Sequence, residues 1–177
     1  MRKGVLFMKR RFLAVTAAAL ALSILSSTAA FAQGWGKTDN KWFYYLEDGS
    51  VAKDTWIDTD GGPYWVRNDG VMATSQWVSD NGSWYYVDSN GRRLLSQLLK
   101  LNNDLFWLDA DGVMAAEQWI QTEDGKWYYF QADGKAVKNG WKLIGGDYYY
   151  FLKSGVMAKD ALVPGGYRVG SDGRWIQ

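Results

Sequence analysis

The sequence predicts an all-β solenoid of about seven stacked β-hairpins, each encoded by a repeat of roughly 21 residues. Two observations predict this fold. A glycine follows each aromatic run at a nearly fixed interval of 21 residues, with one interval of 22 and a last one of 18. A Trp or Leu stands seven residues after each of the first six of these glycines. A unit this short cannot bury its own apolar face and must stack on its neighbours. The seven key glycines are Gly49, Gly70, Gly91, Gly112, Gly134, Gly155 and Gly173.

Residues 1–32 are predicted to be a secretory signal peptide. A basic stretch at 9–11 precedes an apolar run from 12 to 25, and Ala30 and Ala32 are the small residues expected before a cleavage site. The apolar run is shorter than the roughly 20 residues that cross a bilayer. We therefore expect residues 33–177 to form one secreted solenoid domain that does not span the membrane.

Within each unit the sequence predicts two antiparallel strands joined by a tight turn. In the third unit Asn81-Gly82 is a strong signal for a two-residue hairpin loop, and it sets Trp77 opposite Tyr86. The same rule pairs every first-strand Trp or Leu with the residue five positions before the key glycine. It predicts two-residue loops at 39–40, 60–61, 102–103 and 145–146, and a three-residue loop at 123–125 that explains the interval of 22.

The alternation of side chains along a strand predicts two faces. The residues six and four positions before each key glycine, such as Tyr64 and Val66, are always apolar or aromatic and are predicted to form the buried face. The residues seven and five positions before it, such as Trp84 and Tyr86, are predicted to share the other face with the first-strand Trp. Segments just after the glycines, such as 71–73, are predicted to connect one hairpin to the next and pack between them.

Composition excludes several classes of function. Subtracting the five basic residues of the leader from 20 Lys and Arg leaves 15 against 19 Asp and Glu, a net charge of −4 for the secreted part. This charge argues against nucleic acid and favours cationic ligands. The chain lacks Cys and His, which excludes thiol nucleophiles, Ser-His triads and the common zinc sites. The acids before the key glycines, such as Asp133, are predicted to form turns, so no enzyme, metal site or cofactor is expected.

Aromatic side chains are more numerous than such short repeats can bury: the chain has 11 Trp, 11 Tyr and 7 Phe. Ring faces carry negative charge density, and a box of them binds a quaternary ammonium by cation–π attraction worth about 2 kcal/mol or more once desolvated. A methionine beside such a box would add a soft apolar wall. The surplus rings therefore predict an organic-cation site.

The repeat pattern GW-x-GxWYYF-xxxG-x-M-xxGW is present at Gly140-Trp141, at 127–130 and at 112–114. It resembles the choline-binding, or cell-wall-binding, repeats of secreted bacterial surface proteins, and the resemblance covers nearly all of the chain after residue 32. It implies a left-handed solenoid with choline sites between successive hairpins, each built from two aromatic residues of one hairpin, a third from the next and often a Met. It also implies that the protein binds phosphocholine on teichoic or lipoteichoic acids of the cell wall.

Three interfaces match the implied pocket best. They combine Trp35 and Trp42 with Trp65 and Met72; Trp77 and Trp84 with Trp107 and Met114; and Trp119 and Trp127 with Tyr150 and Met157. The other interfaces are weaker candidates. The second has Pro63 in place of a ring, the fourth has Leu98 and Leu105, and the sixth faces Arg168.

Two other functions remain open from the sequence. Similar repeats occur in glucan-binding modules, where rings stack flat on sugar, so a carbohydrate-binding module of the α-glucan type is one alternative. The other is a structural surface protein that forms a homodimer and has no small ligand. Binding to α-glucan that free choline does not affect would favour the first, and a dimer that responds to no ligand would favour the second.

Overall fold

The computed structural model describes residues 32–176, so residues 1–31 of the predicted signal peptide lie outside the described residues. Between 32 and 176 every regular element is a β-strand, and no helix there could span a membrane. The strands are β1 (Gly34–Thr38), β2 (Lys41–Tyr45), β3 (Thr55–Thr59), β4 (Gly62–Val66), β5 (Gln76–Asp80), β6 (Ser83–Val87), β7 (Gln97–Leu101), β8 (Asp104–Leu108), β9 (Gln118–Gln121), β10 (Trp127–Phe130), β11 (Gly140–Ile144), β12 (Asp147–Phe151), β13 (Ala161–Val163), β14 (Tyr167–Val169) and β15 (Trp175–Ile176).

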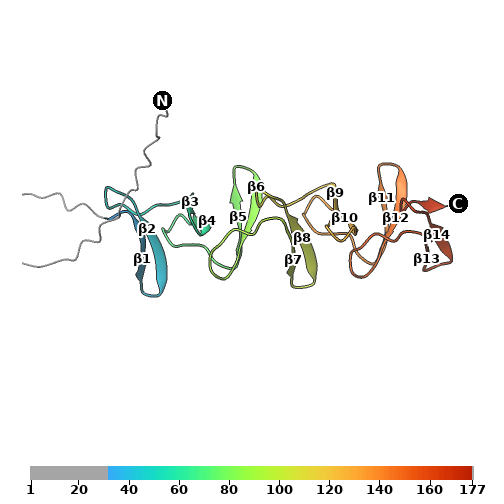
Figure 1. The fold of residues 1–177 in the computed structure, drawn as a ribbon, viewed down its shortest axis with the longest axis horizontal. Coiled ribbons are helices and arrows are strands. Elements are labelled where there is room, and N and C mark those ends of the chain that lie inside the picture. The colour runs from blue at the N-terminus through green and yellow to red at the C-terminus, as the bar shows by residue number, and fades with distance from the viewer. Residues whose placement is uncertain (1–31, 177) are drawn as a thin grey trace, which may run out of the picture.

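Consecutive strands pair into seven hairpins that follow one another along a single long axis (Figure 1). Each of the first six hairpins is a separate two-stranded antiparallel sheet, and the seventh gains β15 as a third strand. Neighbouring hairpins extend from the axis in different directions, which is clear for β5–β6 and β7–β8 in Figure 1. The predicted all-β repeat array is therefore confirmed.

The predicted strand register is also confirmed in every unit. Trp77 pairs with Tyr86, and Asn81 and Gly82 both have positive φ in the two-residue loop between β5 and β6. In the fifth unit Trp127 pairs with Gln121, and the Thr122 N–H donates to the Lys126 carbonyl at 2.9 Å. That hydrogen bond encloses the three residues 123–125 that the sequence predicted as the loop.

The connections after the key glycines hold the stack together through main-chain hydrogen bonds in two directions. The Met72 N–H donates to the Trp42 carbonyl of the preceding hairpin at 2.8 Å, and the Ala73 N–H donates to the Trp65 carbonyl of its own hairpin at 2.8 Å. The same pair of bonds recurs at Arg93 and Leu94, Met114 and Ala115, Ala136 and Val137, and Met157 and Ala158. Through these bonds each connection joins its own hairpin to the preceding one, as in other repeat proteins.

The core is a series of small clusters, each shared by consecutive hairpins. Ala52, Ile57 and Val66 form one cluster, and Trp35 and Tyr44 of the first hairpin pack against it. The residues four positions before the key glycines are fully buried at six of the seven repeats: Val66, Val87, Leu108, Phe130, Phe151 and Val169. This part of the predicted buried face is confirmed.

The acids before the key glycines shape the turns, as predicted. The Asp69 carboxylate accepts a hydrogen bond from the Val71 N–H at 3.0 Å, and this bond holds the pKa of Asp69 below its usual value. Asp133 accepts from the Lys135 N–H at 3.1 Å in the same way. Around Asp111 the acceptor is instead Asp109, which takes the N–H groups of residues 111 and 113. These carboxylates are therefore occupied by their own backbone.

Candidate ligand sites between the hairpins

The first-strand Trp of each aromatic unit is packed edge-on against two rings. Trp77 lies 5.3 Å from Tyr86 of its own hairpin and 4.9 Å from Phe106 of the next, measured between ring centroids, with the ring planes inclined at 78° and 67°. Trp35 lies between Tyr44 and Tyr64, and Trp119 between Tyr129 and Tyr149, in the same manner. One ring comes from the position five before the key glycine, and the ring across the interface comes from the position six before it.

The ring across each interface is therefore displaced by one residue from the sequence prediction. Trp65, Trp107 and Tyr150 were expected there, and the structure places Tyr64, Phe106 and Tyr149 there instead. Adjacent strand residues point to opposite faces. Trp65 faces its own Trp56 at 5.2 Å, so the side chain that reaches the preceding hairpin is Tyr64.

Of the three residues six positions before the glycine, which the sequence predicts to lie on the buried face, Phe106 is buried and the other two are not. Tyr64 and Tyr149 are half-buried, and all three rings line a hollow at the interface. We call the three hollows cage 1, cage 3 and cage 5, after the hairpin that precedes each. Cage 1 contains Trp35, Trp42, Tyr64 and Met72; cage 3 contains Trp77, Trp84, Phe106 and Met114; cage 5 contains Trp119, Trp127, Tyr149 and Met157.

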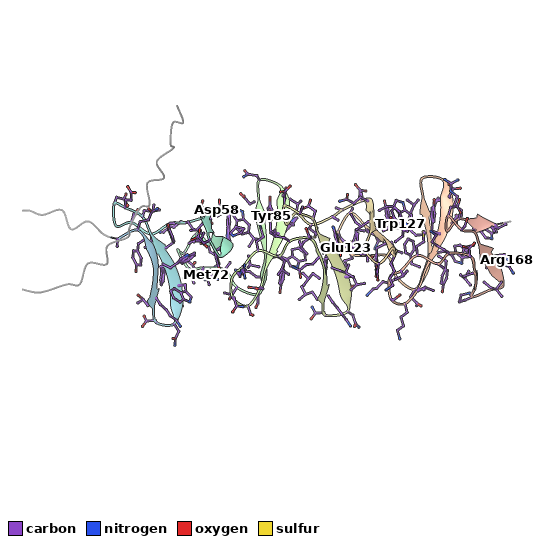
Figure 2. All side chains as sticks on the ribbon, viewed as in Figure 1. Asp58, Met72, Tyr85, Glu123, Trp127 and Arg168 are labelled. Atoms are coloured by element: carbon purple, nitrogen blue, oxygen red, sulfur yellow. The ribbon has the colours of Figure 1, made fainter. Side chains whose placement is uncertain are left out.

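The nine other sequence-predicted residues are brought together as expected, two Trp and one Met in each cage. The hollows measure about 300, 400 and 500 Å³ in cages 1, 3 and 5. Figure 2 shows Trp127 beside the β11–β12 hairpin and Met72 on the connection that follows the second hairpin. The second Trp of each cage forms the outer wall; Trp84, for example, is 47% exposed.

Charged groups stand at the rims of two cages. Asp133 and Lys135 line cage 3, and Asp172 and Lys159 line cage 5. A carboxylate at the rim attracts a cation, and the neighbouring lysine can face an anionic group attached to that cation. At cage 1 the Lys37 ammonium lies 5.6 Å from the Trp42 ring centroid, which places a cation within interaction range of that ring.

A fourth cage lies at the sixth interface, which the sequence treated as a weak candidate. Four rings line it: Trp141, Tyr148, Tyr167 and Trp175. Trp141 lies 5.9 Å from Tyr167 and 6.5 Å from Trp175, and Tyr148 lies 6.3 Å from Trp175. We call this hollow of about 280 Å³ cage 6.

Arg168 does not line the sixth interface, contrary to the sequence prediction. Arg168 is exposed at the C-terminal end of the array (Figure 2), because the one-residue displacement brings Tyr167 to the interface in its place. Trp175 stands two residues after its key glycine, the position that Met72, Met114 and Met157 occupy in earlier units. Aligning that position across the repeats is the signal that would have found the fourth ring.

The second and fourth interfaces have different side chains at the equivalent positions. At the second, Trp56 and Tyr85 lie 5.2 Å apart and Arg93 stands in the place of the methionine. At the fourth, Leu98 and Leu105 pack against Tyr128 and Ala136, so aliphatic groups fill the space. Burial there raises the pKa of the Tyr128 hydroxyl.

The four cages suit one kind of ligand on physical grounds. Their walls are ring faces and Met side chains, which attract positive charge but offer few hydrogen-bond acceptors. An ammonium with N–H groups would lose hydrogen bonds to water on entering, whereas a quaternary ammonium has none to lose. Among residues 32–176 no group of three His, Cys, Asp or Glu side chains could hold a metal ion.

Stacked hairpins with aromatic hollows between them define the chain as a β-solenoid repeat protein. The chain belongs to the choline-binding repeat family. The family model described as choline-binding repeat matches residues 51–92 and 135–175, and the one described as putative cell wall binding repeat matches residues 33–51 and 117–136.

Solved structures of Streptococcus pneumoniae proteins are similar to this chain. CbpJ is 30% identical with a TM-score of 0.67, covering 81% of this chain and 48% of its own. Choline binding protein F is 33% identical with a TM-score of 0.66, covering 82% of this chain and 48% of its own. A structure of CbpF in complex with ipratropium is 31% identical with a TM-score of 0.66, covering 82% of this chain and 49% of its own.

The chain thus spans about half the length of these solved structures. The modular autolysin LytC, at 23% identity and a TM-score of 0.63, shares the fold; 81% of this chain and 37% of that one are covered. The comparison with curated protein sequences gave no match.

Proposed function

We propose that this protein is a non-catalytic cell-wall-binding protein that holds choline, as phosphocholine on teichoic or lipoteichoic acids, in cages 1, 3, 5 and 6. One observation carries the proposal. At four interfaces three or four rings converge on one hollow, with a Met at three of them and Trp175 at the fourth. The similarity to CbpF, solved with ipratropium bound, supports a small-molecule site in this fold.

Retention on the wall follows from the number of cages. A single cation–π cage contributes only about 2 kcal/mol or somewhat more, so one site binds weakly. A polymer that carries many choline groups can engage several cages at once, and linked sites raise the overall affinity without any new contact. The predicted signal peptide would deliver the chain to the cell surface, where such polymers are accessible.

The geometry of the rings favours choline over the α-glucan alternative. In the cages the rings are mutually inclined, at 67° between Trp77 and Phe106 and at 89° between Trp141 and Tyr167. Inclined rings enclose a compact, roughly spherical group such as trimethylammonium. A sugar ring instead stacks on an exposed flat face, and the cages present few coplanar faces to it.

The test is retention of the protein on a tertiary-amine resin that mimics choline, followed by elution with free choline while tryptophan fluorescence is recorded. Retention, elution at millimolar choline and a fluorescence change are expected, since each cage is weak. The variant Trp84→Ala/Trp127→Ala removes the outer walls of cages 3 and 5 and should lose most retention. Leu162→Ala, at a side chain 68% exposed outside the cages, should change nothing.

Two results would overturn the proposal. One is passage of the folded protein through the resin. The other is retention that free choline does not reverse. Binding to α-glucan that is insensitive to choline would establish the carbohydrate alternative. A dimer that responds to neither ligand would establish the structural one.

A further inference from the structure

We propose that Arg93 is a built-in cation that occupies the second interface and closes it to ammonium ligands. The inference rests on the proposed function for what the open cages bind. It depends on three observations: the position of Arg93 in the repeat, the rings that face its guanidinium, and the hydrogen bonding of its Nε.

Arg93 occupies the place of a cage methionine. Its N–H donates to the Pro63 carbonyl of the preceding hairpin at 3.1 Å, as the Met72 N–H donates to the Trp42 carbonyl at 2.8 Å. Its aliphatic stem packs over Gly112: a Cβ there would meet the Arg93 Cγ and Cδ at 3.0 Å. A Cβ at Gly91 would meet the Met72 methyl in the same way, at 2.8 Å.

The guanidinium lies where the ligand of an open cage is expected. Its Cζ is 4.9 Å from the Trp56 ring centroid and 5.3 Å from the Tyr85 ring centroid. Trp56 and Tyr85 stand 5.2 Å apart with planes at 72°, which is close to the arrangement of Trp77 and Phe106 in cage 3. One cation therefore faces both rings that correspond to the inner walls of an open cage.

The rings of Trp56 and Tyr85 face the positive charge on this side. The Arg93 Nε is buried and, within the described part of the chain, has no hydrogen-bond partner. Arginine is weakly hydrated and stacks well on aromatic faces, which makes it suited to this environment. The Trp56 Nε1–H donates to the Asp80 carboxylate at 3.2 Å, and this bond fixes the ring beneath the guanidinium.

Two effects then exclude a ligand from the second interface. The guanidinium fills the space between the rings, and its positive charge repels a second cation at short range. Pro63 adds to this, because it replaces the outer Trp that completes cages 1, 3 and 5. Opening the interface should therefore require removal of Arg93, while restoring the outer ring alone should not suffice.

The experiment is a choline titration followed by NMR of the indole N–H signals, which reports on each cage separately. In the unchanged protein choline should shift the Trp77 signal and leave the Trp56 signal in place. In Arg93→Met/Pro63→Trp, which recreates the residue types of an open cage, the Trp56 signal should shift over the same choline range as Trp77. Pro63→Trp alone and the matched control Arg92→Met/Pro63→Trp should leave it unmoved.

Several outcomes would overturn the inference: a Trp56 shift with choline in the unchanged protein or in Pro63→Trp, or no shift in the folded Arg93→Met/Pro63→Trp variant. A second measurement needs neither a ligand nor a variant. In the unchanged protein the Arg93 side-chain protons should be shifted upfield by the ring currents of Trp56 and Tyr85; ordinary shifts would also overturn it. If no Trp signal responds to choline, the proposed function fails, while the ring-current measurement still tests the position of Arg93.

Discussion

Trp77 of the third hairpin and Phe106 of the fourth lie edge to face, with ring centroids 4.9 Å apart. This contact sets the inner corner of cage 3 and is repeated by Trp35 with Tyr64 and by Trp119 with Tyr149. The residue next to Phe106 in the chain, Trp107, points away from the cage and packs in the fourth interface. Each interface therefore takes its third ring from one residue earlier than the family pattern suggested.

Replacing Phe106 by Leu should weaken choline binding in cage 3 by about 3- to 30-fold, because a ring that faces the cation is lost while apolar bulk is retained. Trp107→Leu loses a larger ring but should leave the cage 3 affinity unchanged. Titration of the Trp77 indole signal measures both, and a thermal melt checks that Trp107→Leu is folded. The opposite pattern would mean that the sequence-predicted ring is the one that contacts the ligand.

Gly134→Ala should destabilise the protein by at least about 1 kcal/mol. Gly134 has a φ of +76°, and a Cβ there would contact the Met114 thioether directly. The same change should weaken cage 3, because Met114 would have to move out of its wall. Urea denaturation and choline titration measure the two effects.

The matched control is Gly82→Ala, since Gly82 has a φ of +79° and a Cβ there would meet nothing within 4 Å. It should cost about 1 kcal/mol from the backbone conformation alone, less than Gly134→Ala. Equal losses for the two alanine variants would show that the contact with Met114 is not the cause.

Trp175→Leu should abolish or strongly weaken the response of Trp141 to choline and leave that of Trp77 intact. Trp175 supplies the fourth ring of cage 6 and lies 6.5 Å from Trp141 and 6.3 Å from Tyr148. Ile176→Ala, at the adjacent exposed residue of β15, is the control and should preserve both responses. A normal Trp141 titration in Trp175→Leu would remove cage 6 from the proposed sites.

The buried hydroxyl of Tyr128 should make stability fall at alkaline pH. Burial raises the pKa of Tyr128 above its usual value of about 10, so the unfolded chain releases this proton at a lower pH than the folded one. The contribution is fully present below pH 10 and is lost as the pH rises through the folded pKa. Tyr128→Phe should show a smaller drop in urea midpoint between pH 9 and pH 11 than the unchanged protein. Identical drops would contradict this account.

Much of the fold was predictable from local patterns. The spacing of the key glycines gave the number of hairpins, and turn pairs such as Asn81-Gly82 gave the register that the structure confirms. Both features depend on interactions within about 20 residues of chain, where turn chemistry and the alternation of strand side chains determine the outcome. The two tryptophans and the methionine of cages 1, 3 and 5 were also predictable, because all three hold fixed positions in the repeat.

Local patterns along the chain therefore fix the composition of each hairpin: its strands, its register and its aromatic residues. The orientation of successive hairpins, and with it the side chain that crosses each interface, depends on how one repeat packs on the next. Tyr64 and Trp65 are adjacent in the strand and point to opposite faces of the hairpin, so the orientation of one hairpin on the next decides which of the two rings faces the interface. The same stacking placed Trp175 into cage 6 and the Arg93 guanidinium between Trp56 and Tyr85. These contacts join residues of different repeats, and no pattern within a single repeat encodes them.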